Sequence, residues 1–292
     1  MKLIKQSFEF INQTDFSLVG IKKHIERCAR VSYKSEDKIT DTSYEKFVNM
    51  LESRGHDRPL EFGTVYLKTT NNESFSQKYR CNPYSKVALK YPEGDMPNIY
   101  CVPTHYITTN YRVIKENHWE DDLKYLCEPT EYHYKRYTVH MILDRGVMDE
   151  FRTHVGLSHL AESTRYCNYS KDKFNNELTF IKPCWCNIPL GDYGTSSLPG
   201  DNIIGLSGGA MVLIDSLLDT EHDYLTLLDQ GWTPQQARSV LPLCIKSELI
   251  SCGFEDAWEN FFRRRDAPDA HPMAQEIANP MHKEFFKLTR AR

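Results

Sequence analysis

The spacing of apolar residues along the chain predicts a mixture of helices and strands. In residues 16–31 apolar side chains such as Ile21, Ile25 and Cys28 recur every three or four positions, which is the period of an amphipathic helix. In residues 64–70 apolar and polar side chains alternate, as they do in a half-buried strand. By these criteria we predict strands over residues 1–10, 64–70 and 136–143, and helices over residues 16–31, 44–54, 147–155, 205–230 and 273–286, with another helix around Trp258, Phe261 and Phe262.

Glycine and capping residues mark where several of these helices end or begin. Gly55 and Gly231 directly follow helical patterns, and glycine readily adopts the left-handed conformation that ends a helix. Thr233, Pro234 and Gln236 form the pattern of a capping box with proline in the first turn. We therefore predict that a further helix begins at this point.

The stretch of residues 71–133 interrupts this plan. It is rich in Tyr, Asn and Pro and ends in a predicted helix over residues 119–127. We interpret it as an insertion in a simpler fold. It either forms a lid or subunit contact, or it packs on the surface without a further role.

The overall charge restricts the kinds of ligand that the chain can bind. The 292 residues include 36 Lys and Arg against 40 Asp and Glu, which gives a net charge of −4. A protein that neutralises many nucleic-acid phosphates needs a basic excess, so we expect no nucleic-acid polymer as a partner. A small anionic ligand would have to meet a local cluster of basic residues.

The sequence shows no targeting segment and no apolar run approaching the roughly 18 residues that a membrane span requires. We therefore expect a soluble, cytoplasmic protein that contacts no membrane. The nine cysteines are scattered and odd in number, which favours reduced thiols over a disulfide scaffold. Their spacing predicts no metal site.

The densest group of polar residues lies in residues 153–166. Ser163 and Arg165 are close enough in sequence to offer a hydroxyl and a guanidinium to one phosphate group. The same residues would also fit a capped turn with Arg165 in a surface ion pair. Arg238 and Arg265 are further candidates for an anion site, although most arginines on helices are merely solvated.

Several short motifs follow one another in a fixed order along the chain. They are Cys-Ala-Arg-Val-Ser at residues 28–32, Gly-His-Asp-Arg-Pro-Leu-Glu-Phe at 55–62, Glu-Ser-Thr-Arg-Tyr-Cys-Asn-Tyr-Ser at 162–170, Gly-Trp-Thr-Pro-Gln-Gln-Ala-Arg-Ser-Val-Leu-Pro at 231–242, and Trp-Glu-Asn-Phe-Phe at 258–262 followed by Arg265. This series resembles the flavin-dependent thymidylate synthase family. The resemblance covers most of the chain apart from the middle stretch.

The resemblance implies a single domain over residues 1–292 of the α/β (α+β) class, with a central sheet flanked by helices. It implies a homotetramer with sites shared between subunits. It also implies methylation of dUMP at C5, with methylenetetrahydrofolate as the carbon donor and FAD reduced by NADPH as the hydride source. The protein would then position the reactants and stabilise charge on the pyrimidine.

The resemblance also implies roles for individual residues. Ser163 and Arg165 would hold the nucleotide phosphate, and Arg238 would join them from another subunit. Arg265 would face the pyrimidine carbonyl and take part in catalysis together with His154. The remaining expected contacts are Glu150 with the nucleotide, and Ser32, His154, Ser158, Glu162 and Asn260 with the cofactor.

The chain departs from the family pattern on the flavin side. The family has Arg-His-Arg where this chain has Thr153, His154 and Val155, and the apolar Leu160 and Ala161 stand where the family has polar residues. Each lost arginine removes a charge-assisted contact of about 1.5–3 kcal/mol, so we expect weakened FAD binding.

Arg152 directly precedes the altered triplet and could supply one of the missing guanidinium groups. On a helix, a shift by one residue turns the side chain by about 100°, so this replacement needs a change in the backbone.

Three functions remain open. The first is a flavin-dependent thymidylate synthase with an altered flavin site. The second is a flavin-independent C5 hydroxymethylase, in which water quenches the transferred carbon because no hydride is supplied. The third is a catalytically silent relative that binds a nucleotide or acts as a scaffold.

Overall fold

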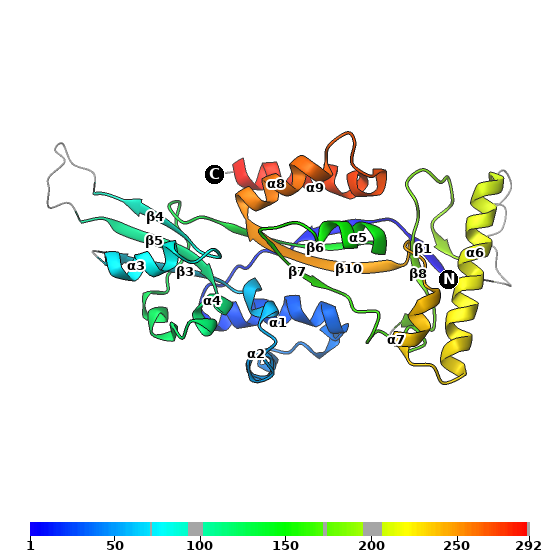
Figure 1. The fold of residues 1–292 in the computed structure, drawn as a ribbon, viewed down its shortest axis with the longest axis horizontal. Helices are drawn as coiled ribbons and strands as arrows, with labels where there is room; N and C mark the ends of the chain where they lie inside the picture. Colours follow the sequence, from blue (N-terminus) through cyan, green and yellow to red (C-terminus); the bar gives the residue numbers. More distant parts are fainter. Residues whose placement is uncertain (71, 93–101, 172–173, 195–205, 291–292) are drawn as a thin grey trace.

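A four-stranded antiparallel sheet forms the centre of the fold (Figure 1). The computed structural model describes residues 1–70, 72–92, 102–171, 174–194 and 206–290. The sheet runs from edge to edge through β2 (Ser7–Phe10), β6 (Arg136–Asp144), β10 (Lys246–Phe254) and β7 (Leu157–Ala161). Strand β10 pairs with β6 along its whole length and with β7 over part of it, so its backbone is covered on both edges.

Helices cover both faces of this sheet. Side chains alternate between the two faces of a strand, so Ile250 and Cys252 pack against α1 (Leu18–Tyr33), which in turn contacts α2 (Ser43–Ser53). Leu249 points to the opposite face. The helices on that face are α5 (Arg145–Phe151), α8 (Glu255–Arg265) and α9 (Pro272–Arg290). The predicted mixed α/β architecture, with a central sheet between helices, is confirmed.

A second sheet, in the order β3-β5-β4, lies at one end of the molecule (Figure 1). Its first strand, β3, spans Thr64–Thr70, as predicted from the alternating pattern. The rest of this end is formed by β4 (Lys86–Lys90), β5 (Thr104–Asn110), α3 (Glu73–Arg80), α4 (Tyr111–Glu116) and the 3-10 helix η3 (Glu120–Tyr125). The described part of residues 71–133 thus extends a sheet that begins at β3, and the helix predicted over residues 119–127 is a 3-10 helix. Whether the stretch is an insertion stays a prediction.

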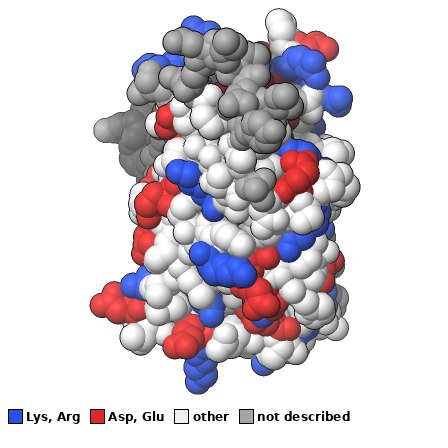
Figure 2. Space-filling view, turned by 90° about the vertical axis from the view of Figure 1, so that its left-hand side faces the viewer, with Lys and Arg blue, Asp and Glu red and all other residues white. Residues whose placement is uncertain are grey.

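The surface at this end carries charges of both signs. Figure 2 looks onto it and shows lysines and arginines interspersed with aspartates and glutamates over the described residues. Several lysines lie over tyrosine rings, including Lys68 over Tyr106 and Lys86 over Tyr134. Positive charge is therefore not gathered on this face into a site for an anion.

The opposite end holds a third sheet, in the order β8-β1-β9. Its members are β1 (Lys2–Ile4), β8 (Thr179–Ile181) and β9 (Gly191–Asp192), packed near α6 (Gly208–Asp229), α7 (Pro234–Ala237) and the 3-10 helix η5 (Arg238–Val240). The single strand predicted over residues 1–10 is therefore wrong. The chain leaves the third sheet after Ile4 and enters the central sheet at Ser7, so two short strands pair with different partners.

The predicted helix ends marked by glycine are confirmed. Gly55 follows α2 with φ of +64°, and Gly231 follows α6 with φ of +86°. The predicted start of the second of these helices, residue 205, lies outside the described residues. Two 3-10 helices precede β3, η1 (Glu36–Lys38) and η2 (Arg58–Phe62). None of the helices in the described ranges combines the length and apolarity that crossing a membrane would require.

The predicted capping box at Thr233 forms, because the Gln236 side chain accepts a hydrogen bond from the Thr233 backbone N–H at 2.9 Å. The helix that it starts is short. It ends at Ala237, and Arg238 begins the 3-10 turn η5. Pro242 explains why the helical segment does not continue beyond η5, because a proline disfavours helical conformation in the residue before it, here Leu241.

The helix predicted over residues 147–155 starts and ends earlier than the pattern indicated. Asp144 caps its start by accepting a hydrogen bond from the Val147 N–H at 2.6 Å, so α5 begins at Arg145. It ends at Phe151, and the chain then turns through Gly156, whose φ is +93°, into β7. Strands β7 and β10 were not predicted, because polar residues interrupt their apolar alternation.

Eight cysteines fall within the described residues, and all are free thiols as expected. Cys101 lies outside the described residues.

The close approach of β7 to β10 yields a test of the fold. A Cβ atom at Gly253 would lie 2.5 Å from Leu157 Cδ2 and 2.9 Å from the Gly156 carbonyl oxygen. We expect Gly253→Ala to lower the free energy of unfolding by about 1–3 kcal/mol, measured by urea denaturation, because the backbone of the turn must shift.

The matched control for this variant is Gly209→Ala in α6, where a Cβ would meet no atom within 4 Å. Alanine favours the helix by about 0.5–1 kcal/mol over glycine, so the control should be neutral or more stable. Equal stability of the two variants would contradict the close packing of β7 on β10.

Candidate active site

Three adjoining cavities lie where β7 faces α1 and η2. The histidine cavity, of about 430 Å³, is lined by residues that include Glu61, His154, Ser158 and His159. The arginine cavity, of about 340 Å³, is lined by Ser32, Glu162, Ser163, Arg165 and Arg238 among others. The tyrosine cavity, of about 520 Å³, is lined by Tyr33, His56, Leu160 and Tyr166 among others.

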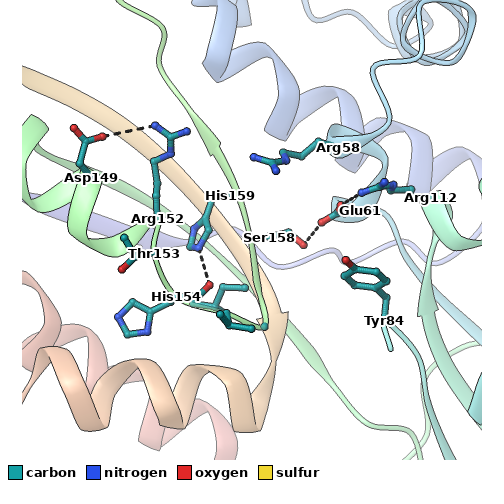
Figure 3. Close-up of a pocket in the computed structure, with 13 residues that line it drawn as sticks. Arg58, Glu61, Tyr84, Arg112, Asp149, Arg152, Thr153, His154, Ser158 and His159 are labelled. Carbon is teal, nitrogen blue, oxygen red and sulfur yellow. Dashed lines mark hydrogen bonds and ion pairs between the residues drawn. The ribbon is translucent and has the colours of Figure 1, made fainter. Parts of the chain in front are cut away.

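The three cavities share part of their walls. Arg58 lines all three, while Arg152 and His159 line both the histidine and the arginine cavity. In Figure 3, Arg58 reaches the cavity from η2 and Arg152 reaches it from the end of α5, with His159 beside them. The cavities therefore form one connected depression with arginine at its centre.

Strand β7 supplies side chains to this depression from both of its faces. Ser158 and Leu160 lie on the α1 face of the sheet, and His159 lies on the other. The His159 ring is held by Ser251 of the neighbouring strand, with 2.8 Å between Nδ1 and Oγ. Burial, together with the nearby charges of Arg152 and Arg58, lowers the pKa of His159 to about 4, so the ring is neutral at pH 7.

Glu61 connects β7 to η2. Its buried carboxylate accepts a hydrogen bond from the Ser158 hydroxyl and forms an ion pair with Arg112. Both partners line the histidine cavity. The Ser158 hydroxyl, which was expected to contact a cofactor, therefore donates a hydrogen bond to a carboxylate of the same chain.

His154, Glu150 and Arg265 meet at the edge of the histidine cavity. Arg265, the last residue of α8, donates from Nε to His154 Nε2 at 2.7 Å and from Nη1 to the Glu150 carboxylate at 2.6 Å. Its Nη2 donates to the Glu150 carbonyl oxygen at 2.8 Å. Three residues that the sequence assigned to catalysis and nucleotide binding are thus brought together.

The charge state of His154 follows from this contact. Burial and the neighbouring Arg265 charge lower the pKa of His154 to about 4. Its Nε2 accepts a hydrogen bond from Arg265 Nε, so the neutral ring carries its own proton on Nδ1. His154 is therefore a neutral hydrogen-bond donor at pH 7.

The residues predicted to hold a phosphate gather at the arginine cavity. Ser163 and Arg165 lie just after β7, and Arg238 donates from Nη1 to the Thr164 hydroxyl at 3.3 Å. Arg165 is steadied by Gln235 of α7, with 3.5 Å between Nη2 and Oε1. Arg238 and Arg165 of one chain line the same cavity, whereas the contribution of Arg238 from another subunit stays a prediction.

The arginine cavity carries a large excess of positive charge. Five arginines line it, Arg58, Arg145, Arg152, Arg165 and Arg238, against one carboxylate, Glu162. That carboxylate is already paired, because Lys246 Nζ donates to it at 2.9 Å. This is the local basic cluster that an anionic ligand of an acidic chain requires.

A buried ionic cluster lies behind the arginine cavity. Lys246 bridges Glu162 and Glu248, and Glu248 also pairs with Lys34 and with His140 Nε2 at 2.9 Å. Burial alone would raise the pKa of Glu248, but these partners outweigh it and hold that pKa well below its ordinary value. The Tyr169 hydroxyl adds a hydrogen bond to Glu162 at 3.2 Å.

The other predicted site residues divide into two groups. Ser32 and Glu162, which were expected to contact the cofactor, line the arginine cavity. Asn260 lines none of the three cavities and accepts a hydrogen bond from Arg263 at 2.6 Å. Arg265 lines none of them either, but it contacts His154 and Thr153, which line the histidine cavity.

The altered triplet lies at the rim of the histidine cavity. Val155 is 90% exposed, and the Thr153 hydroxyl donates to the Glu150 carbonyl oxygen at 2.7 Å. Arg152 is the C-cap residue of α5 and lines both the histidine and the arginine cavity.

Sequence reasoning missed Arg58, Glu61, Arg112 and Arg145. Arg58 and Glu61 belong to the quoted Gly-His-Asp-Arg-Pro-Leu-Glu-Phe motif but received no role. The sequence could have indicated that Arg58 is exposed, because it directly precedes the apolar Pro59 and Leu60. These two residues are buried and hold η2 against the core.

The fold and these cavities define an α/β protein with a cationic site of nucleotide size. The family described as thymidylate synthase complementing protein matches residues 110–289, and the chain belongs to this family. This agrees with the resemblance read from the sequence. No curated protein sequence matches the chain.

Two solved structures similar to this chain are of the UMP/dUMP methylase PolB from Streptomyces cacaoi. The structure bound with 5-Br dUMP has 17% sequence identity to this chain and a TM-score of 0.43. The alignment covers 99% of this chain and 93% of that chain. The structure bound with 5-Br UMP has 17% identity and a TM-score of 0.42, covering 99% and 92%. Similarity at this level does not bear on the site of this chain.

The lowered pKa of His154 predicts how stability depends on pH. The unfolded histidine, with a pKa near its ordinary value of about 6.5, takes up a proton between pH 7 and pH 5, whereas the folded one stays neutral. The free energy of unfolding should therefore fall over this range, and His154→Gln should reduce the fall by about 1–2 kcal/mol. Urea unfolding at pH 7, 6 and 5 measures this.

The control is His222→Gln, which changes an exposed histidine on α6. It should leave the pH dependence close to that of the unchanged protein. Identical slopes for His154→Gln and the unchanged protein would contradict a neutral His154.

Proposed function

We propose that this chain binds dUMP and transfers a one-carbon unit to its C5 atom. In the full form of the proposal, methylenetetrahydrofolate donates the carbon, FAD reduced by NADPH supplies the hydride, and dTMP is the product. Membership of the thymidylate synthase complementing protein family supports the pyrimidine chemistry. The observation that carries the proposal is the excess of arginine in a cavity that adjoins a neutral His154 held by Arg265.

The arginine cavity would take the phosphate of the nucleotide. Arg165 and Arg238 supply guanidinium groups, and Ser163 supplies a hydroxyl on the same short segment. Charge-assisted hydrogen bonds of this kind are shorter and stronger than neutral ones, and they fix the orientation of the ligand. We also propose the homotetramer that the family resemblance implies, although one chain already brings these phosphate contacts together.

The histidine cavity would take the pyrimidine ring. His154 presents a neutral ring with its proton on Nδ1, and such a donor stabilises negative charge that develops on a carbonyl oxygen. Arg265 uses Nε, Nη1 and Nη2 on His154 and Glu150, so it acts through His154 as a positioning residue. This modifies the expectation that Arg265 itself faces the carbonyl.

The residues around the depression fit an anionic cofactor such as FAD, but with fewer contacts than expected. Ser32, Glu162 and His154 line the cavities, whereas Asn260 lies elsewhere and Ser158 is bound to Glu61. The cationic walls suit the diphosphate of such a cofactor. Bound there, a reduced flavin would supply the hydride that converts the transferred carbon to a methyl group.

A second candidate is the flavin-independent C5 hydroxymethylase. It is favoured by Thr153 and Val155 in place of two arginines and by the exposure of Val155 at the rim. Without a hydride donor, water would attack the transferred carbon and leave a hydroxymethyl group. The third reading, a silent relative, corresponds to nucleotide binding without turnover.

The phosphate contacts can be tested by binding. We expect Arg165→Gln to weaken dUMP binding about 10- to 100-fold in isothermal titration calorimetry, because a charge-assisted contact to the phosphate is lost. Arg54→Gln is the matched control, since Arg54 is exposed at the end of α2 and lines none of the three cavities. Equal dUMP affinity in both variants would refute the phosphate site.

The cofactor and the reaction can be tested together. The freshly purified protein should show flavin absorbance in the visible range, or acquire it on titration with FAD. With dUMP, methylenetetrahydrofolate and NADPH it should then form a product with the mass of dTMP. A hydroxymethyl product formed by colourless protein would establish the second candidate instead, and dUMP binding without any product would establish the third.

A further inference from the structure

Tyr84 lies in the stretch of residues 71–133, and its side chain forms part of the wall of the histidine cavity. It is 52% exposed, and Figure 3 shows its ring across the cavity from Arg152 and His154. Within the described ranges its hydroxyl has no hydrogen-bond partner, and neither an aromatic ring nor a cation contacts its ring. The face of this ring is therefore available to a ligand.

The backbone of Tyr84 is held in a turn directly before β4. Asn82 Oδ1 accepts a hydrogen bond from the Tyr84 N–H at 2.9 Å, and the Ser85 N–H donates to the Asn82 carbonyl oxygen at 3.2 Å. The Ser85 hydroxyl lies 2.8 Å from the Thr109 hydroxyl and so ties the turn to β5. The turn thus fixes the place of Tyr84 in the cavity wall.

A second residue of the same stretch joins this turn to the rest of the cavity. Arg112 of α4 also lines the histidine cavity and forms an ion pair with Glu61 of η2. Glu61 in turn accepts the hydrogen bond from Ser158 of β7. The described part of residues 71–133 therefore does more than pack on the surface, because it contributes side chains to the cavity.

Other tyrosines of the stretch have different surroundings. Tyr106 and Tyr111 are buried, and Tyr125 packs on Phe75 with 4.8 Å between the ring centroids. None of these three tyrosines lines any of the three cavities. The rings that pack this end of the molecule are therefore others than that of Tyr84.

We propose that Tyr84 stacks on the pyrimidine ring of the nucleotide and is the residue by which the site recognises a base. The arginine cavity holds a phosphate by charge and does not distinguish one phosphate ester from another. An aromatic side chain adds this distinction, because every base has a flat face on which it can stack. The inference rests on the proposed function, which takes the pyrimidine to lie in the histidine cavity.

Stacking would also orient the ring for the reaction. The cavity has a volume of about 430 Å³, which is ample for a pyrimidine, so contacts are needed to fix its plane. His154 donates at the edge of the ring, and Tyr84 lies on the other side of the cavity and would cover its face. Together they define the position of C5, and such positioning is a large part of catalysis.

The test compares dUMP with 2-deoxyribose 5-phosphate, which carries the same sugar and phosphate but no base. We expect Tyr84→Ala to weaken dUMP binding about tenfold in isothermal titration calorimetry, because stacking on the base is lost. The affinity for 2-deoxyribose 5-phosphate, measured by displacement of dUMP, should stay within about twofold. Tyr84→Phe keeps the ring and should bind dUMP within about twofold of the unchanged protein.

The matched control is Tyr91→Ala. Tyr91 follows the other end of β4, is 55% exposed and lines none of the three cavities, so its loss should change neither affinity. Arg165→Gln should weaken both ligands, since it acts on the phosphate. The proposal is overturned if Tyr84→Ala weakens both ligands equally, or if it affects dUMP no more than Tyr91→Ala does. Thermal unfolding midpoints verify that the variants are folded.

A fluorescent variant tests the ring contact directly. In Tyr84→Trp the new indole should be quenched by dUMP and not by 2-deoxyribose 5-phosphate. Because the chain contains four other tryptophans, the signal is the difference between this variant and the unchanged protein. Equal quenching of the variant and the unchanged protein by dUMP would contradict stacking.

These outcomes separate the inference from the proposed function. If dUMP binds with the expected dependence on Tyr84 but no product forms, the one-carbon transfer is refuted and the inference stands. If the chain converts dUMP and the Tyr84 variants bind it as the unchanged protein does, the inference alone is refuted. Absence of dUMP binding to the unchanged protein refutes both.

Discussion

The buried carboxylate of Glu248 ties together the parts of the chain that build the site. It lies in β10, the strand shared by both halves of the central sheet, and meets Lys34 from the end of α1, Lys246 from its own strand and His140 from β6. A buried carboxylate without such partners is strongly destabilising, and breaking a pair of this kind costs about 3–5 kcal/mol. The fold therefore holds α1 and the sheet in one relative position. Because Lys246 also binds Glu162, the segment that carries Ser163 and Arg165 is anchored to the same cluster.

The elements predicted correctly from the sequence are those whose periodicity is local. The helix α1 and the strand β3 show their buried faces within a few residues, and the capping box at Thr233 lies entirely within one turn. Strand β10 was missed because Lys246 and Glu248 interrupt its apolar alternation. Glu248 is buried and Lys246 half-buried, and their partners Glu162, Lys34 and His140 are distant in sequence, so this pairing has no local signature.

In the candidate site, too, some residues were identified from local motifs and others depend on contacts between distant segments. Motifs identified Ser163, Arg165 and Arg238, and the structure brings them to one cavity. Arg58 belongs to the Gly-His-Asp-Arg-Pro-Leu-Glu-Phe motif, but its place in the cavity wall depends on how η2, β7 and the end of α5 pack together. Position in the sequence also suggested that Arg265 faces the ligand, whereas its three hydrogen-bonding nitrogens are engaged by His154 and Glu150. Composition and spacing can reveal that a guanidinium is present, but not which of its donors are already used.

Within the described residues, strand β7 lies at the edge of the central sheet and pairs with β10 alone. An edge strand presents alternate backbone N–H and C=O groups away from its neighbour. Strand β7 also contacts η2, and its residues Leu157, Ser158 and His159 line the histidine cavity. Main-chain hydrogen bonds do not depend on side-chain identity, so an edge strand beside a cavity offers polar groups that remain when the neighbouring side chains change.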